Sequence, residues 1–207
     1  MSTINRDATD FQSVDISSFP EESRYKFLTA SVVPRPIALV TSLGKKGVLN
    51  AAPFSQFVII SVSPPLLGIV AHEIGGMFKD TVRNILESGE FVINSVTVAM
   101  AGQVQECAVA HPPEVSEVAV VGFHTLASVK VAPSRIAESP LHFECQLHKT
   151  VYFGDECSRT SLIVGEVVLV HGADGVIANH RVDHWSLNPL GRIAGRAYCL
   201  TKDVIQV

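Results

Sequence analysis

Residues 141–153 read LHFECQLHKTVYF, a stretch in which apolar and polar side chains alternate. Successive side chains of a strand point to opposite faces, so this period of two predicts a long strand with one buried face. The predicted buried face comprises Leu141, Phe143, Cys145, Leu147, Val151 and Phe153, and the predicted polar face comprises His142, Glu144, Gln146, His148 and Thr150.

A second strand is predicted after a polar turn. Residues 160–172, TSLIVGEVVLVHG, are rich in β-branched residues and suit an antiparallel partner for the first strand. Gly165 lies inside this run, where a glycine is typical of a β-bulge. The two segments together predict a long hairpin.

More strands are predicted nearer the N-terminus. Residues 36–43, PIALVTSL, are followed by GKKG, which is typical of an exposed hairpin turn. Residues 54–61, FSQFVIIS, and 66–72, LLGIVAH, have the composition of two further strands. Pro64 and Pro65 between them cannot donate ladder hydrogen bonds, so a loop or a sheet edge is expected there.

A helix is predicted where the period changes. Residues 79–91, KDTVRNILESGEF, place an apolar stripe on one helical face, with Asp80 or Thr81 as the N-cap and Gly89 as the C-terminal stop. The predicted buried stripe comprises Val82, Ile85 and Leu86.

The remaining segments complete a mainly β protein with peripheral helices. Residues 91–96 predict a strand, 97–110 a second helix, and 111–140 extended loops with short strands. Residues 1–24 are polar and are expected to form an irregular arm, and residues 25–207 a single domain. Many hairpin-connected strands and few helices favour an antiparallel barrel with helices packed outside.

Composition excludes several classes of protein. Of the 207 residues, 47% are hydrophobic and 17% charged, which is too apolar for a disordered chain. The formal net charge is -4 and no basic block occurs, so a nucleic-acid partner is not expected. An apolar surface could be hidden in an oligomer.

The cysteines and the N-terminus favour a cytoplasmic protein. Four cysteines lie far apart without a Cys-x-x-Cys pair, which favours buried, reduced thiols. The N-terminus lacks the basic and apolar regions of a signal peptide. The longest apolar run, residues 57–71, is interrupted and falls short of the about 20 residues that span a bilayer, so no membrane partner is expected.

The common catalytic and nucleotide motifs do not occur. The sequence has no P-loop, no G-x-G-x-x-G after a strand and no G-x-S-x-G elbow. His180 and His184 are four residues apart, but no second ligand pair or H-E-x-x-H motif accompanies them. Neither a metal site nor a catalytic dyad is predicted, and pairing of Cys107 or Cys145 with a histidine has no support beyond coincidence.

One segment has the chemistry of a phosphate site. Lys79, Asp80 and Thr81 precede or begin the predicted helix, where free N–H groups, a cation and a hydroxyl together suit an anion. Arg83 and Asn84 could add donors. The alternative is an ordinary capped helix at the surface.

Polar residues in the apolar stretch 50–65 suggest a second ligand contact. Asn50, Ser55, Ser61 and Ser63 lie towards the expected strand ends rather than along one face. There they could offer hydroxyls and an amide to the rim of a planar polar heterocycle. The alternative is that they form local hydroxyl-to-backbone bonds that shape turns.

An ordered set of segments resembles the flavin reductase-like family of FMN-binding split-barrel proteins, which includes flavoredoxins and NAD(P)H:flavin oxidoreductases. The set spans about residues 24 to 200. Its segments are SVVPRPIALVTS, LNAAPFSQFVIISVSPPLL, KDTVRNI, GEFVINSV, AESPLHFECQL, LIVGEVVLVH and PLGRIAGRAYC.

The resemblance implies a homodimer of six-stranded antiparallel Greek-key split barrels that bind FMN, less often FAD, near the subunit interface. The residues implied to line the flavin ring and ribityl chain are Asn50, Ala51, Ala52, Pro53, Phe54, Ser55, Ser61, Val62 and Ser63. Those implied at the phosphate are Arg35, Lys79, Asp80 and Thr81.

The implied chemistry belongs to the flavin, which takes a hydride from a nicotinamide and passes electrons on, so no catalytic side chain is required. Arg192, also implied to bind the cofactor, stands where related flavin reductases have a tyrosine, and His184 lies farther upstream than their histidine. This pattern looks more like the flavoredoxins.

Three functions follow from these patterns. The first is an FMN-dependent oxidoreductase that uses NAD(P)H, the second a flavoredoxin-like carrier that receives electrons from a partner protein, and the third a split-barrel protein that binds another ligand without redox chemistry.

Overall fold

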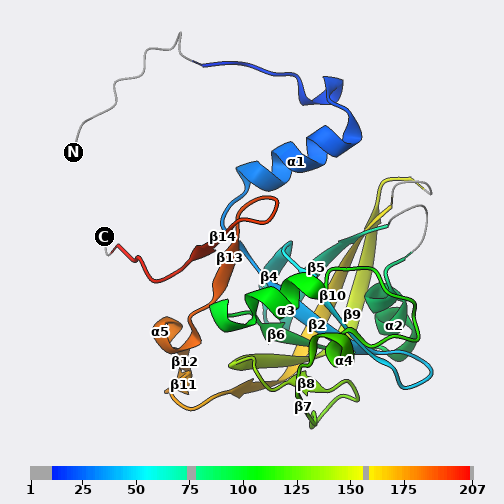
Figure 1. Ribbon diagram of the computed structural model, residues 1–207, viewed down its shortest axis with the longest axis vertical. Helices are drawn as coiled ribbons and strands as arrows, with labels where there is room; N and C mark the ends of the chain where they lie inside the picture. Colours follow the sequence, from blue (N-terminus) through cyan, green and yellow to red (C-terminus); the bar gives the residue numbers. More distant parts are fainter. Residues whose placement is uncertain (1–10, 74–77, 156–158, 206–207) are drawn as a thin grey trace.

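The main sheet is antiparallel and has seven strands. The computed structural model describes residues 11–73, 78–155 and 159–205. The strand order is β3-β2-β6-β9-β10-β5-β4, where the resemblance implied six strands. The bounds are β2 (Ala38–Leu43), β3 (Leu49–Phe54), β4 (Phe57–Val62), β5 (Pro65–His72), β6 (Glu90–Ser95), β9 (Leu141–Phe153) and β10 (Thr160–Gly172). The expected mainly β architecture is confirmed (Figure 1).

The two edges of this sheet are consecutive in the chain. Residues 54–61 were expected to form one strand, but β3 ends at Phe54 and β4 begins at Phe57. The backbone oxygen of Gln56 accepts a hydrogen bond from the Val70 N–H at 2.9 Å, which ties this corner to β5. Because only Ser55 and Gln56 separate the edge strands, the sheet curls towards closure at this corner.

The predicted hairpins are confirmed. β2 and β3 pair across the turn at Gly44–Gly47, and β4 pairs with β5 across the turn that contains Pro64. β9 pairs with β10 along almost their whole length, with a register shift between Val164 and Gly165. Gly165 is therefore at a bulge, as the sequence indicated.

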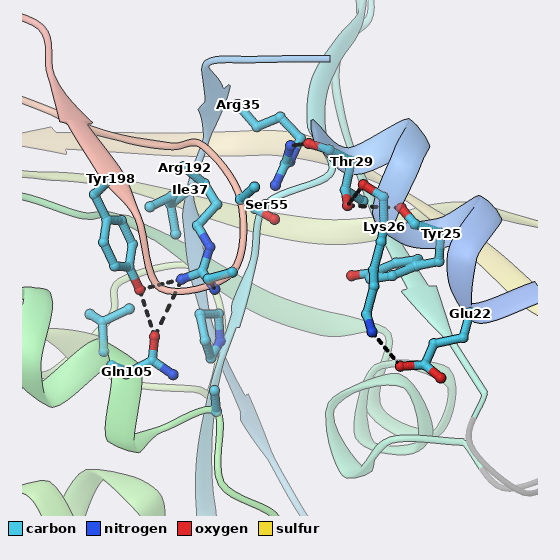
Figure 2. Close-up of a pocket in the computed structure, with 15 residues that line it drawn as sticks. Glu22, Tyr25, Lys26, Thr29, Arg35, Ile37, Ser55, Gln105, Arg192 and Tyr198 are labelled. Atoms are coloured by element: carbon cyan, nitrogen blue, oxygen red, sulfur yellow. Dashed lines mark hydrogen bonds and ion pairs between the residues drawn. The ribbon is translucent and has the colours of Figure 1, made fainter. Parts of the chain in front are cut away.

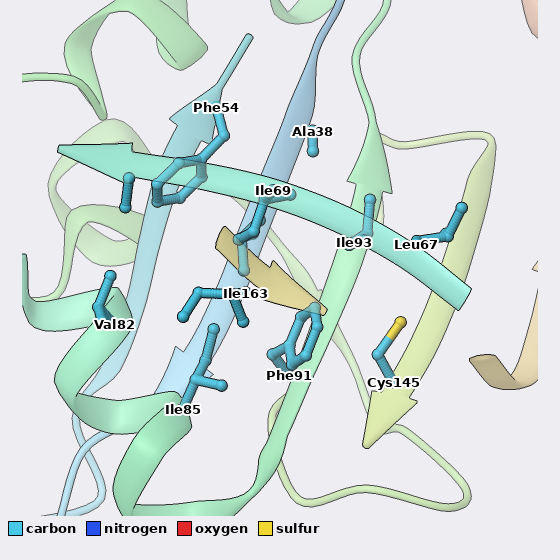
Figure 3. Packing of buried hydrophobic residues seen from close by; sticks show 12 residues of the cluster. Ala38, Phe54, Leu67, Ile69, Val82, Ile85, Phe91, Ile93, Cys145 and Ile163 are labelled. Carbon is cyan, nitrogen blue, oxygen red and sulfur yellow. The ribbon is translucent and has the colours of Figure 1, made fainter. Parts of the chain in front are cut away.

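The barrel interior holds the first of two hydrophobic clusters. Figure 3 shows Phe91 of β6 and Ile163 of β10 facing Val82 and Ile85 of helix α2 (Asp80–Ser88). The predicted stop is confirmed, since Gly89 has φ 74°. Two details differ from the prediction: Lys79 is the N-cap, and it makes no side-chain cap bond. Leu86, expected to be buried, is 37% exposed.

The second cluster lies between the sheet and short helices. The expected helix at 97–110 forms as η3 (Val98–Met100) followed by α3 (Ala101–Glu106). Helix α4 (Glu117–Val121) lies in a segment whose prolines and glycines indicated extended loops with short strands. The same segment contains β7 (Thr125–Leu126) and β8 (Arg135–Ile136).

The polar face of β9 is not solvated over its first half. His142 and Glu144, expected on the exposed face, are both buried. The Glu144 carboxylate accepts hydrogen bonds from the Val129 N–H at 2.8 Å and the Lys130 N–H at 2.6 Å. The expectation of a half-buried strand was wrong here because a loop covers this face and its N–H groups satisfy the carboxylate.

The terminal segments form small elements beside the barrel. They are η2 (Ile16–Ser18), α1 (Glu21–Ser31), β1 (Arg35–Pro36), β11 (Ile177–Ala178), β12 (Arg181–Val182), α5 (His184–Leu187), β13 (Leu190–Arg192) and β14 (Tyr198–Leu200). Strands β1, β13 and β14 form a separate sheet. Figure 1 shows α1 at the outer edge of the molecule. The described part of the expected arm is irregular at residues 11–15 and helical in η2 and the start of α1, and its division from the domain at residue 24 stays a prediction.

Three cysteines agree with the expectation of reduced thiols. Cys107 and Cys145 are free and buried, and Cys199 is free and half-buried. Burial is the main cause that raises the pKa of the Cys107 thiol to about 12, and the charges of Glu117 and Glu106 contribute to the same rise. Such thiols are poor nucleophiles. Cys157 lies outside the described residues.

Candidate functional site

A cavity of about 580 Å³ lies between α1, the end of β3, α3 and the β13–β14 hairpin (Figure 2). Of the predicted cofactor residues, four line it: Arg35, Pro53, Ser55 and Arg192. The other wall residues are Glu22, Tyr25, Lys26, Thr29, Ile37, Val104, Gln105, Ala108, Ala194, Gly195 and Tyr198.

Arg35 is a buried cation in the cavity wall. It is 8% exposed, and its Nη1 donates to the backbone oxygens of Thr29 and Val32. Its Nε is buried without a partner, and no carboxylate among the described residues forms an ion pair with it. Buried donors are normally satisfied, so this guanidinium suits an anionic ligand.

Arg192 is held by neutral groups. Its guanidinium lies 4.6 Å from the centroid of the Tyr198 ring, and it donates to the Tyr198 hydroxyl and to the Gly195 oxygen. It also donates to Gln105 Oε1 at 3.3 Å, and Tyr198 Oη donates to the same oxygen at 2.8 Å (Figure 2). These contacts orient the side chain and leave its charge uncompensated.

Lys79 lies outside the cavity wall, at the start of α2. Its ammonium is 5.5 Å from the centroid of the Phe54 ring, and desolvation lowers its pKa. None of the ion pairs of the described residues includes Lys79. A cation at a helix N-terminus, with no acidic partner in that part of the chain, fits a phosphate.

His72 connects the Lys79 region to the cavity. Its ring hydrogen-bonds Gln56 Oε1 at 2.7 Å and Thr160 Oγ1 at 3.0 Å, and it packs edge-on against Tyr25, a cavity residue. Desolvation lowers the pKa of His72, and the charge of Lys79 lowers it further. His72 thus lies beside Gln56 of the β3–β4 corner and contacts the cavity residue Tyr25.

Asn50 and Thr81 are placed differently from the expectation. Both are buried, and the Thr81 hydroxyl donates to Asn50 Oδ1 at 2.7 Å instead of facing solvent beside Lys79. Asn50 Nδ2 and the Ala51 N–H donate to one oxygen of Glu117, at 2.9 and 3.1 Å. This network attaches α2 to β3 and α4.

The predicted cofactor residues at the end of β3, and Asp80 beside it, differ in how deeply they are buried. Ala51 is buried in the second cluster and Phe54 in the first, while Ala52 and Pro53 are half-buried. Asp80 is half-buried and pairs with Arg83 at 2.5 Å, so it is not a free carboxylate facing a phosphate.

The serines at the β4–β5 turn lie away from the cavity wall. Ser61 Oγ accepts a hydrogen bond from the Ser63 N–H at 3.2 Å, which is the local turn-forming bond named as the alternative. Val62 between them is 86% exposed.

Comparison with known proteins decides the family. Residues 30–186 match the family model described as "Flavin reductase like domain". The chain belongs to the flavin reductase-like family. An uncharacterised member of this family, YwrF of Bacillus subtilis, is 35% identical over 192 residues, covering 91% of this chain and 92% of that protein.

Solved structures agree with this assignment. Nitrilotriacetate monooxygenase component B from Bacillus cereus has a TM-score of 0.91 and 32% identity, covering 95% of this chain and 98% of that one. The 2-nitrobenzoate 2-nitroreductase NbaA of Pseudomonas fluorescens has a TM-score of 0.87 and 34% identity, with 95% of each chain covered. The flavoredoxin of Desulfovibrio vulgaris, at 18% identity and a TM-score of 0.71 over 85% of this chain and 91% of that one, shares the fold.

The two histidines that the sequence analysis considered for a metal lie in and just after the β11–β12 hairpin. His180 lies in the β11–β12 turn, and His184 stacks on Trp185 with ring centroids 4.5 Å apart. No group of three or more His, Cys, Asp or Glu side chains within the described ranges is arranged to hold a metal ion. Of the helices in those ranges, none is long and apolar enough to cross a membrane.

Sequence reasoning missed Glu117, Gln105, Tyr25 and Glu22. The sequence carries no local signal for them, because each reaches the site or its supporting network only through the packing of α1, α3 or α4.

Proposed function

We propose that this flavin reductase-like protein binds FMN across the β3–β4 corner, with its phosphate at Lys79 and its ring system along Phe54, Pro53 and Ser55. The observation that carries the proposal is the Lys79 ammonium at the N-terminus of α2, with which no acidic side chain of the described residues forms an ion pair. FMN is favoured over FAD because one phosphate needs one such cation, whereas the second phosphate of FAD would need further donors there.

The protein's part is to bind and orient the cofactor. When bound, FMN supplies hydride and electron transfer, which side chains cannot perform. Lys79 and the first-turn N–H groups of α2 would hold the phosphate, the Phe54 ring lies beside Lys79, and the Asn50–Glu117 network holds α2 in place. Ser55 offers a hydroxyl at the cavity rim.

Replacing Lys79 tests the phosphate site. We expect Lys79→Ala to weaken FMN binding at least tenfold, equivalent to about 1.4 kcal/mol, because the variant loses the charged partner of the phosphate. FMN titration followed by flavin absorbance measures this. Lys149→Ala, which removes an exposed lysine on β9, is the matched control and should leave affinity unchanged. Equal affinities for all three proteins would place the phosphate elsewhere.

The proposed reductant is NAD(P)H. Anaerobic addition of NADH or NADPH to the FMN-loaded protein is expected to bleach the flavin absorbance. Bleaching by dithionite but by neither nucleotide would instead favour the second candidate, a flavoredoxin-like electron carrier. That candidate has one observation in its favour: His184 stacks on Trp185 and is not among the cavity residues.

We further propose that the protein is a homodimer through strand β4. β4 is an edge strand, and Ile59 and Val62 are 72% and 86% exposed, which is a liability for an isolated chain. Light scattering is expected to give about twice the 22.3 kDa chain mass, and Ile59→Lys to return the chain mass. A wild-type monomer would contradict this interface.

A further inference from the structure

The cavity beside α1 has an anion-binding end and apolar walls. Arg35 and Arg192 both line it (Figure 2). The Tyr25 and Tyr198 rings and three aliphatic side chains form much of the rest: Ile37, Val104 and Ala108. Lys79 is not among the wall residues, so this pair of cations is separate from the proposed phosphate site.

The cavity carries an excess of positive charge. Its one carboxylate, Glu22, pairs with Lys26 at 2.6 Å, and both of these side chains are exposed. Neither Arg35 nor Arg192 has a carboxylate within ion-pair distance in the part of the chain that the structure describes. Two guanidiniums therefore face the cavity without acidic partners, and the Nε of Arg35 lacks any hydrogen bond.

Several neutral polar groups of the wall are already engaged. The Thr29 hydroxyl donates to the Tyr25 backbone oxygen at 2.8 Å. The Tyr198 hydroxyl donates to Gln105, and the same Gln105 oxygen also receives Arg192. A ring with one anionic group would place that group at the arginines and its carbons against the walls.

We propose that this cavity binds the carboxylate of a small aromatic acid. Arg192, fixed by its contact with the Tyr198 ring, is the main anchor of the carboxylate, and the guanidinium of Arg35 in the same wall adds a second positive charge. A guanidinium matches the planar, two-oxygen geometry of a carboxylate. The ligand's ring packs between the tyrosines and the aliphatic wall. Pro53 and Ser55, along which the flavin ring is proposed to lie, also line this cavity, so the aromatic acid would lie beside that ring. Its anchoring by the two arginines does not require the flavin.

Calorimetric titration of the full chain with benzoate tests the proposal, with benzyl alcohol and acetate as the neutral and ringless probes. We expect saturable benzoate binding that is at least tenfold tighter than that of either other probe, and that persists when the protein is saturated with FMN. Arg192→Gln is expected to weaken benzoate binding at least tenfold and Arg192→Lys less. Arg181→Gln, at an exposed arginine of β12, should have no effect.

The possible failures are distinct. Equal affinities for benzoate and benzyl alcohol would overturn the role of the arginines. Equal affinities for benzoate and acetate would overturn the role of the apolar walls. Loss of benzoate binding on FMN loading would show that the cavity belongs to the flavin. The comparison of probes on the wild-type chain decides the matter even if Arg192→Gln does not fold. Benzoate binding without FMN binding would refute the proposed function and leave this inference intact.

Discussion

Gly165→Ala is expected to lower the free energy of unfolding by about 3 kcal/mol, the upper part of the usual range for overpacking a core. A Cβ at this position would lie 2.3 Å from Cζ of Phe91 and 3.1 Å from the Cβ of Cys145. Phe91 is fully buried among the side chains of the first cluster, so its ring cannot turn out into solvent (Figure 3). Chemical denaturation followed by circular dichroism measures the change.

Gly172→Ala on the same strand is the matched control. A Cβ there would approach Ile177 Cγ1 to 2.5 Å, a similar overlap, but Ile177 is 42% exposed and can turn away. The expected cost is below about 1 kcal/mol. Equal losses from the two substitutions would mean that backbone conformation at the glycines, and not the packing against Phe91, sets their effect.

Glu144→Gln is expected to cost about 3 kcal/mol at pH 7. Glu144 is completely buried and accepts hydrogen bonds from the Val129 and Lys130 N–H groups and from His171 Nε2 at 2.6 Å. The glutamine removes the charge and turns an NH₂ group towards a donor, so a buried charge-assisted bond is lost and a donor is left unpaired. Thermal or chemical denaturation measures the loss.

The loss of stability caused by Glu144→Gln should become smaller as the pH falls. Burial alone would raise the pKa of Glu144, but its hydrogen bonds outweigh burial and hold the pKa below the ordinary value of 4.5. A depressed folded pKa gives stability that is complete above 4.5 and disappears as the pH falls through the folded pKa. The difference between wild type and Glu144→Gln should therefore shrink in acid.

Glu138→Gln serves as the control for the carboxylate. Glu138 also accepts from a backbone N–H and a histidine, both of His124, but at a more exposed site. Its replacement should cost less than about 1 kcal/mol. If Glu138→Gln and Glu144→Gln lower the free energy of unfolding by similar amounts, the burial of the Glu144 hydrogen bonds does not increase their contribution to stability.

The sequence was most informative where the local structure depends on residues that are adjacent in the chain. The alternation in β9, the bulge at Gly165 and the stop of α2 at Gly89 each follow from a backbone preference or a side-chain period that a single segment carries. Helix α4, in contrast, was missed. Its short apolar run has no period long enough to separate a helix from a strand.

The candidate site was less predictable because its contacts join distant segments. The sequence placed Arg35, Lys79 and Thr81 at one phosphate, yet Arg35 lines the cavity, Lys79 lies outside its wall, and the Thr81 hydroxyl bonds Asn50. Whether a hydroxyl meets a ligand or an interior amide depends on which element packs over it, and no local pattern records that.

The sequence by itself determined the antiparallel strands, their principal turns and the family, since these follow from local period, turn residues and ordered motifs. Only the tertiary structure decided which polar groups are used internally and which stay unpaired. Asn50 meets Glu117 across 67 residues of chain, and this contact takes Asn50 into the interior. Arg35 and Arg192 meet at the cavity through the pairing of β1 with β13, and their unpaired charges exist because folding brings no carboxylate of the described chain to them.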